Sequence, residues 1–308
     1  MGTPEFAGTN LKALIDGGFN VVLALCQPDK PVGRKHILTA PPVKVMAIEN
    51  NIEVYQPDTL RNEEALNKLS SYEPDLIVTA AYGKILPAAI LDLPKYGCIN
   101  CHGSLLPARR GASPVQRAIL EGDKVTGVTF MKMDVGMDTG DMIDKVEVEI
   151  DPNEHTESLM NRLAEASAAK LPELIDSWVE GKLTTTKQDE SLATACPPIR
   201  PEEGEFTWDQ DSAAIHNRVR ALSAWPGAFV LKEDKKLKVL DSEVADESLV
   251  PDELKNSEPG TVVKAKGENL IVKCGTGFLK VKELQQPGGK KLRAADCAHN
   301  FKVGSPII

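Results

Sequence analysis

The sequence predicts an α/β protein, in which a domain with a mainly parallel β-sheet precedes a smaller domain that forms a β-barrel. Up to about residue 182, short apolar runs alternate with helical patterns, which is typical of strand–helix units around a parallel sheet. Residues 183–204 lose that periodicity and include the linker-like stretch CPPIRPEEG. Residues 228–303 then show short alternating strands and glycine-rich turns, which fit a small barrel. We therefore expect a catalytic domain at 1–182, a linker at 183–204 and a second domain at 205–308.

Apolar and helical patterns place the elements of the first domain in alternating order. The expected strands are 21–25, 75–80, 96–101, 126–133 and 142–150, and the expected helices are 11–16, 42–50, 63–69, 114–121 and 156–179. One further helix is expected at 211–222, ahead of the barrel. In an open parallel sheet, ligands bind beyond the C-terminal ends of the strands, so candidate site residues are sought there.

Composition is that of a cytoplasmic globular protein. Hydrophobic residues make up 42% of the 308 residues, and no apolar run is long enough to span a membrane. The N-terminus lacks the basic-then-apolar layout of a secretion signal. The 6 cysteines are scattered, which favours reduced thiols over a disulfide framework. Cys98 and Cys101 form a C-x-x-C, but on a strand they would face opposite ways, so we expect no metal or redox site there.

The net charge of −9 argues against a general nucleic-acid-binding protein. The C-terminal part departs from this average, because basic residues stand at 264, 266, 273, 280, 282, 290, 291, 293 and 302 against Glu268, Glu283 and Asp296. Two interpretations remain open for this segment. It is either a specific site for a polyanion or a solvated surface of mixed charge.

Residues 98–140 contain the strongest candidates for catalysis. Asn100 and His102 are two residues apart on an expected strand, so their side chains point the same way from its end. Asp138 follows between two glycines. An amide donor, an imidazole and a carboxylate together suit acyl-type transfer, in which an oxyanion must be stabilised and a proton moved.

Four sequence blocks resemble the folate-dependent formyltransferases. They are N-x-H-x-S-L-L-P at 100–107, R-G-A-x-P at 110–114, T-G-V-T at 126–129 and G-M-D-T-G at 136–140. Within that superfamily, MGTPEF at 1–6, QPDKPVGRK at 27–35 and AWPGAF at 224–229 are similar to the members that act on initiator methionyl-tRNA. The resemblance implies a Rossmann-like first domain and an OB-like, tRNA-binding second domain.

The implied reaction transfers the formyl group of 10-formyltetrahydrofolate to the free α-amino group of initiator methionyl-tRNA, for translation initiation. By this resemblance Asn100 donates to the developing oxyanion, and His102 donates to it or relays a proton. Asp138 sets the protonation of His102 and assists removal of a proton from the attacking amine. We expect no metal, no membrane association and a monomer.

The resemblance also assigns the binding residues. The folate site is expected at Ser104, Leu105, Leu106 and Pro107, where a polar residue and a proline-terminated apolar pair would form a wall for a flat ligand, and at Ala81, Tyr82 and Gly83. The charged segment 29–39 has no periodicity and is expected to be a mobile loop that contacts tRNA. The expected tRNA contacts are Lys30, Arg34, Lys35, Lys290, Lys291 and Arg293, with Arg34 foremost.

Other interpretations keep the chemistry but change the acceptor: a sugar-nucleotide or glycinamide-ribonucleotide formyltransferase, or a formyltetrahydrofolate hydrolase. A non-catalytic RNA-binding protein is a further alternative, against which the trio of Asn100, His102 and Asp138 counts. Members of the superfamily carry a short apolar strand just before MGTPEF, whereas this sequence starts at Met1, inside that block. We expect that the sequence is trimmed or its start misassigned; the alternative is a chain that lacks the strand and folds less stably.

Overall fold

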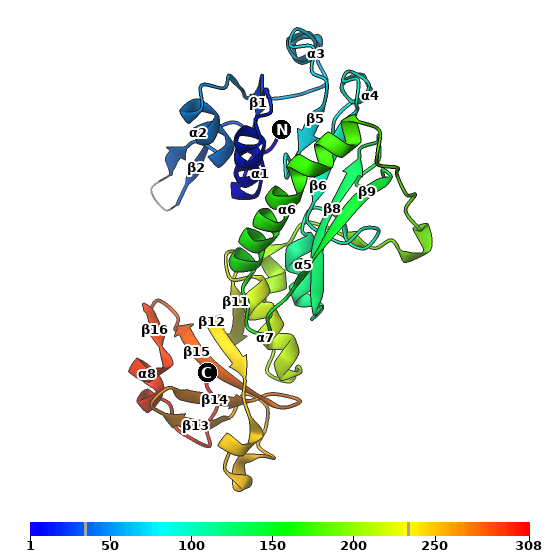
Figure 1. Ribbon diagram of the computed structural model, residues 1–308. Coiled ribbons are helices and arrows are strands. Elements are labelled where there is room, and N and C mark those ends of the chain that lie inside the picture. Colours follow the sequence, from blue (N-terminus) through cyan, green and yellow to red (C-terminus); the bar gives the residue numbers. More distant parts are fainter. Residues whose placement is uncertain (34–35, 233–234) are drawn as a thin grey trace. The chain divides into compact units, whose positions relative to one another are not determined.

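The computed structural model describes residues 1–33, 36–232 and 235–308, although for residue 232 only the backbone is described (Figure 1). It divides into two compact units. The first comprises Met1–Pro114, Val125–Glu149 and Met160–Pro197, and the second comprises Val115–Lys124, Ile150–Leu159 and Pro198–Ile308. In the described residues, no helix is both long and apolar enough to cross a bilayer.

The first unit contains most of the expected strand–helix pattern. Its helices are α1 (Glu5–Asp16), α2 (Pro42–Glu49), α3 (Glu63–Ser70), α4 (Ala88–Leu91) and most of α6 (Thr156–Val179). Its strands are β1 (Ala24–Leu25), β2 (Lys30–Val32), β3 (Ile37–Thr39), β4 (Val54–Tyr55), β5 (Ile77–Thr79), β6 (Cys98–His102), β7 (Arg110–Gly111), β8 (Val125–Lys132), β9 (Met142–Glu149) and β10 (Ala195–Cys196). A 3₁₀ turn, η1 (Glu190–Leu192), lies ahead of β10.

Parallel and antiparallel pairs share the main sheet, whose order is β5-β6-β8-β9. β5 and β6 are parallel, as are β1 and β4. β8 lies antiparallel to both β6 and β9. The short connection between β8 and β9 explains why these two strands are antiparallel, because a parallel crossover needs a dozen or more residues. The prediction of an α/β fold with parallel strands is confirmed. The strands expected at 126–133 and 142–150 correspond to β8 and β9, and their antiparallel pairing is what the structure adds.

Local sequence explains why α3 forms and which face it buries. The Asn62 side chain accepts a hydrogen bond from the Ala65 amide at 3.0 Å and so caps the helix. Ala65 and Leu69, four residues apart, are both buried and belong to a core cluster that also contains Ile77, Ile90 and Cys98. This core holds β5 and β6, the two strands that end at the candidate site.

Segment 29–39, for which no secondary structure was expected, contains a hairpin, so that part of the prediction was wrong. Its mobility and its contact with tRNA stay predictions. β2 and β3 pair antiparallel, with Lys30 opposite Thr39 and Val32 opposite Ile37. β-Branched residues favour extended backbone, and Gly33 adopts a positive φ of 70° where the chain turns. All six strand residues are exposed, which explains why no alternating apolar pattern marks them in the sequence.

A cleft of about 620 Å³ lies beside Met1 in the first unit. It is lined by residues 21–25 and 74–78 on two sides and by parts of α1 and the end of α6. Gly2 donates to the Leu25 carbonyl at 2.8 Å, and the Ala80 amide donates to the Met1 carbonyl at 2.9 Å. Met1 and Gly2 are therefore hydrogen-bonded on one side to the end of β1 and on the other to the residue after β5, as a strand between β1 and β5 would be. Gly2 and Ala80 form a parallel bridge.

An engineered extension ahead of Met1 is expected to fill this cleft. Five residues that alternate valine or isoleucine with threonine should raise Tm by several degrees, because they would bury apolar side chains and add backbone hydrogen bonds. A Gly-Ser extension of equal length is the control. Both extensions replace the buried Met1 amine, which donates to the Val78 carbonyl, by an amide. Equal Tm values for the two proteins, measured by differential scanning calorimetry, would contradict the prediction.

The second unit is built on an antiparallel sheet. Its strands are β11 (Ala228–Lys232), β12 (Lys235–Val244), β13 (Val262–Lys266), β14 (Asn269–Lys273), β15 (Phe278–Gln285) and β16 (Lys291–Arg293), in the order β11-β12-β15-β14-β13 with β16 beside β15. The helices are α5 (Pro114–Leu120), α7 (Ser212–Ala221) and α8 (Ala294–Cys297), with 3₁₀ turns η2 (Pro201–Gly204), η3 (Glu247–Leu249), η4 (Asp252–Leu254) and η5 (Ala298–Asn300). Within the described residues no ladder closes this sheet, so the barrel stays a prediction.

A buried histidine makes the second unit sensitive to acid. His216 Nε2 lies 2.9 Å from the Pro152 carbonyl, and Nδ1 lies 3.1 Å from the Ser242 hydroxyl. Nε2 therefore carries the proton, and Nδ1 accepts from the hydroxyl. Burial lowers the pKa of His216 below its ordinary value. Below about pH 6.5 the unfolded state consequently binds more protons than the folded state, so stability is lost as the pH falls.

Replacement of His216 by glutamine is expected to reduce the loss of stability between pH 7 and pH 5. Glutamine retains a donor and an acceptor but does not titrate. Between pH 7 and pH 5, Tm of the wild type should fall more steeply than Tm of His216→Gln. His299→Gln, at an exposed position, serves as the control and should follow the wild type. Identical slopes in His216→Gln and wild type would show that His216 does not contribute.

Candidate active site

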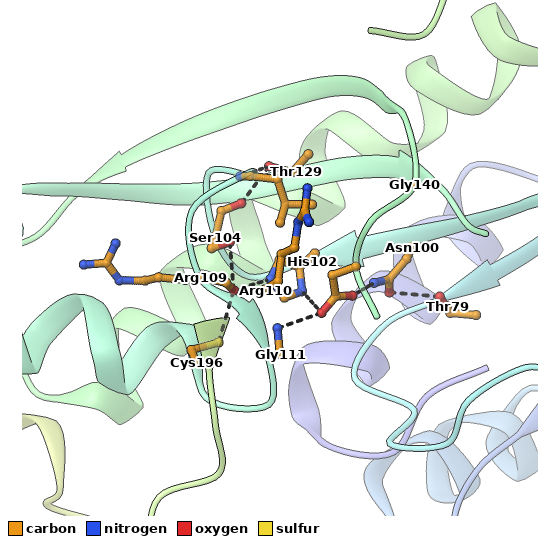
Figure 2. Close-up of polar contacts among 12 residues, drawn as sticks. Thr79, Asn100, His102, Ser104, Arg109, Arg110, Gly111, Thr129, Gly140 and Cys196 are labelled. Atoms are coloured by element: carbon orange, nitrogen blue, oxygen red, sulfur yellow. Dashed lines mark hydrogen bonds and ion pairs between the residues drawn. The ribbon is translucent and has the colours of Figure 1, made fainter. Parts of the chain in front are cut away.

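Strand β6 holds Asn100 and His102 on one face, as the alternation of a strand requires (Figure 2). In register, Asn100 lies opposite Thr79 of β5, and His102 lies opposite Thr129 of β8. His102 is 6% exposed, whereas Asn100 is half-buried. The Thr79 hydroxyl donates to Asn100 Oδ1 at 2.9 Å. The Asn100 side-chain oxygen is thereby occupied, which orients its NH₂ group.

Asp138 lies in the tight connection between β8 and β9. Asp134 Oδ1 accepts from the Gly136 amide at 2.9 Å and from the Thr139 hydroxyl at 2.7 Å. A Cβ on Gly140 would lie 1.8 Å from the Lys132 carbonyl oxygen, so only glycine fits there. Asp138 itself has a φ of 54°, in the left-handed region. These constraints turn the backbone so that the carboxylate faces β6.

The Asp138 carboxylate meets three groups. Asn100 Nδ2 donates to Oδ1 at 3.3 Å, and the Gly111 amide donates to Oδ2 at 2.9 Å. His102 Nδ1 lies 3.5 Å from the same Oδ2. The structure thus brings together the three side chains expected to be catalytic, while their roles stay predictions.

The other ring nitrogen of His102 is held by the backbone. Nε2 lies 2.9 Å from the Arg109 carbonyl oxygen, which can only accept, so Nε2 carries a proton (Figure 2). The same carbonyl accepts from the Cys196 thiol at 3.1 Å. Nδ1 is the ring nitrogen that faces the Asp138 carboxylate. This arrangement suits proton transfer at the end of β6.

The expected folate segment at 104–107 divides into buried and accessible residues. Ser104 is buried and donates to the Ala108 carbonyl at 2.7 Å. Leu106 is fully buried, and its amide donates to the Thr129 hydroxyl at 3.0 Å. Leu105 and Pro107 are half-buried. Ser104 and Leu106 therefore brace the segment, and Leu105 and Pro107 are the residues that a ligand can reach.

The second expected folate segment follows β5, at the edge of the sheet where β6 also ends. Ala81 and Gly83 are exposed, with positive φ values of 46° and 78°. Tyr82 lies between them, but its side chain packs in the hydrophobic core, and burial raises the pKa of its hydroxyl to about 12. The Tyr82 carbonyl accepts from Gln27 Nε2 at 3.0 Å. The turn thus offers backbone, rather than the Tyr82 ring, to a ligand.

The residues expected to contact tRNA lie in both units. Lys30 is exposed on the β2–β3 hairpin, whereas Arg34 and Lys35 lie outside the described residues. Lys290, Lys291 and Arg293 are exposed where the chain passes from β15 to β16. In the second unit these three form a compact basic segment, with Asp296 close to Arg293 at 3.6 Å.

Cys98 and Cys101 are buried, free thiols. Burial raises the pKa of each to about 12, so neither ionises readily. Across residues 1–33, 36–232 and 235–308, no group of three His, Cys, Asp or Glu side chains is arranged to hold a metal ion.

Three contacts of the site were missed in the sequence. The Gly111 amide and the Arg109 carbonyl belong to backbone that no side-chain pattern reveals, although Gly111 lies within the R-G-A-x-P block. Gln188 is the third: its Nε2 donates to the carbonyls of Asp138 and Gly140, each at 2.8 Å. It lies in the segment expected as a linker, and no sequence signal marks it.

Comparison with known proteins identifies the family. Residues 1–175 match the family described as formyl transferase, and residues 198–302 match the formyl transferase C-terminal domain. The chain belongs to the formyl transferase family. This formyl transferase is 45% identical over 305 residues to a methionyl-tRNA formyltransferase of Caldicellulosiruptor saccharolyticus, covering 98% of this chain and 96% of that protein. It is 43% identical over 312 residues to the methionyl-tRNA formyltransferase of Halalkalibacterium halodurans, and the match covers 100% of this chain and 96% of that protein.

Solved structures support the fold of this formyl transferase. A sugar 3N-formyl transferase, solved in the presence of dTDP and 5-N-formyl-THF, superposes with a TM-score of 0.64 at 20% identity. The match covers 92% of this chain and 95% of that one. At this identity the likeness concerns the fold alone.

Proposed function

We propose that this chain transfers the formyl group of 10-formyltetrahydrofolate to the α-amino group of initiator methionyl-tRNA. The observation that carries the proposal is the convergence of Asn100, His102 and Asp138 at the end of β6. The acceptor is inferred from relatives named methionyl-tRNA formyltransferase, which match this chain over nearly its full length.

The proposed chemistry follows from these contacts. The amine attacks the formyl carbon, a new C–N bond forms, and negative charge develops on the formyl oxygen. An amide nitrogen carries two hydrogens, so Asn100 can direct one to Asp138 and the other to this oxygen. The proton lost by the amine passes to His102 Nδ1, where Asp138 stabilises the imidazolium. The bond to the folate nitrogen then breaks, and that nitrogen takes up the proton.

The proposed folate site uses the accessible parts of the two expected segments. Leu105 and Pro107 offer apolar surface directly after β6, and the exposed backbone of Ala81 and Gly83 follows β5. Both strands end at the same edge, because β5 and β6 are parallel with Thr79 opposite Asn100. A flat, partly polar ring requires this combination of apolar contact and backbone hydrogen bonding.

For tRNA we propose two sets of phosphate contacts, one in each unit. Lys30, Arg34 and Lys35 form the first, and Lys290, Lys291 and Arg293 form the second. We infer that the antiparallel sheet of the second unit belongs to an OB-like barrel, a fold that binds oligonucleotides. We further infer a cytoplasmic location, since initiator tRNA is charged and used in the cytoplasm, and the monomer expected from the resemblance stays a proposal.

One assay tests the proposed function. Purified protein is incubated with 10-formyltetrahydrofolate and methionylated initiator tRNA, and formyl-methionine is released and quantified. Methionylated elongator tRNA is the matched acceptor and should be formylated far more slowly. Release of formate without an acceptor would identify a hydrolase, and formylation of an amino-sugar nucleotide in place of tRNA would identify a sugar enzyme. Either result would overturn the proposal.

A further inference from the structure

A buried glutamine far from Asp138 in sequence holds that residue's loop in place. Gln188 is 9% exposed. Its Nε2 donates one hydrogen to the Asp138 carbonyl and the other to the Gly140 carbonyl, both at 2.8 Å. These two carbonyls flank the turn that aims the carboxylate at Asn100 and His102. A side-chain amide has two N–H donors, and both are engaged here.

The side-chain oxygen of Gln188 binds to the strand that contacts the Asp138 carboxylate. Arg110 Nε donates to Gln188 Oε1 at 2.9 Å, and the guanidinium forms paired bonds to Glu190 at 2.9 and 2.8 Å. Arg110 is followed by Gly111, whose amide donates to Asp138 Oδ2. One side chain therefore connects the loop that carries Asp138 with the strand that binds its carboxylate. These contacts also determine the orientation of the amide. In the reverse orientation Oε1 would face two carbonyl oxygens, and none of the three groups can donate a hydrogen.

The rest of the segment supports the same connection. Thr186 and Met142 exchange backbone hydrogen bonds of 2.8 and 2.9 Å. β10 pairs with β7, which places Ala195 opposite Arg110. Residues 186–196 are thus bound to the two backbone segments that meet at Asp138. The Gln188 side chain bonds to both of these segments.

We propose that Gln188 is a positioning residue for formyl transfer, which acts through Asp138 and touches no substrate. The inference rests on the proposed function. Without the amide, two carbonyls and one N–H would lose buried partners, and the turn would relax away from His102. A displacement of about 1 Å at a catalytic group can cost on the order of 10²-fold in rate. Binding of folate and tRNA does not depend on this turn in the proposed site.

The test is Gln188→Met, which has a similar length but cannot make these hydrogen bonds. We expect kcat for formylation of initiator methionyl-tRNA to fall about 10–100-fold, with KM for both substrates within about threefold of wild type. Glu190→Gln is the matched control: it alters the exposed partner of the same arginine and should stay within about threefold in kcat. If Gln188→Met is unfolded at the assay temperature, Gln188→Asn, which is too short to reach all three partners, takes its place.

A double-mutant cycle separates positioning from a general structural role. In an Asp138→Ala background, Gln188→Met should lower kcat by less than about threefold, because there is no carboxylate left to position. An equal loss in both backgrounds, or a wild-type kcat for the single variant, would overturn the inference. An inactive wild type would instead refute the proposed function, so the two failures are distinguishable.

Discussion

Alanine at Asn100, His102 or Asp138 is expected to lower kcat by about 10²-fold or more in each case. One preorganised donor to an oxyanion is worth roughly 10²–10³-fold, which corresponds to ~3–4 kcal/mol of transition-state stabilisation. Loss of His102 removes the proton acceptor, and loss of Asp138 removes both the acceptor for Asn100 Nδ2 and the charge beside His102. Turnover is measured with saturating folate and charged initiator tRNA.

Two further variants make this experiment specific. Asp138→Asn retains the side-chain volume and an acceptor for the Gly111 amide but removes the charge, so it tests the carboxylate alone. His299→Ala replaces an exposed histidine of the second unit and should retain wild-type turnover. Circular dichroism and Tm must show that each variant is folded. More than about a tenth of the wild-type rate in a single variant would remove that residue from the chemistry.

Removal of three positive charges at Lys290, Lys291 and Arg293 is expected to weaken tRNA binding by about 10–100-fold. Each phosphate contact contributes to counterion release. The slope of log Kd against log[salt] should therefore be smaller by roughly two to three in the triple alanine variant than in the wild type. Folate binding should not change. Filter binding between 50 and 200 mM salt measures both quantities.

A second triple variant controls for net charge. Lys12, Lys68 and Lys182 are lysines of the first unit, each paired with a nearby carboxylate. Lys12 and Lys182 are exposed, and Lys68 is half-buried. Their replacement by alanine removes the same charge and should change tRNA affinity by less than about threefold. Equal losses in the two variants would show that affinity follows net charge rather than the β15–β16 segment.

Substitution is a cleaner test of the second unit than truncation. A chain that ends near Pro201 would lose α7, whose Ala221 carbonyl accepts from Thr156 at 2.7 Å. Arg220 on the same helix donates to the carbonyls of Asp151 and Glu154, each at 3.3 Å. Truncation would therefore strip buried partners from residues 150–159, and lost folding could be mistaken for lost binding.

Several helices were predictable because their signals are local. α6 was expected at 156–179 and is found at Thr156–Val179, because a long apolar periodicity determines a helix with little help from the rest of the chain. α3 has its cap and its buried face within eight residues. The β2–β3 hairpin was missed for the opposite reason: its side chains are exposed on both faces and show no alternation.

The sequence by itself determined that Asn100 and His102 share a face, since two-residue spacing on a strand requires it. Only the tertiary structure decided what that face meets. Asp138 reaches Asn100 across 38 residues, and Gln188 reaches the Asp138 carbonyl across 50. Such contacts depend on how β8 folds back on β6 and on where residues 186–196 are bound. These two hydrogen bonds produce no periodic pattern and no unusual composition in the sequence. A single buried hydrogen bond constrains one side chain rather than a pattern of residues.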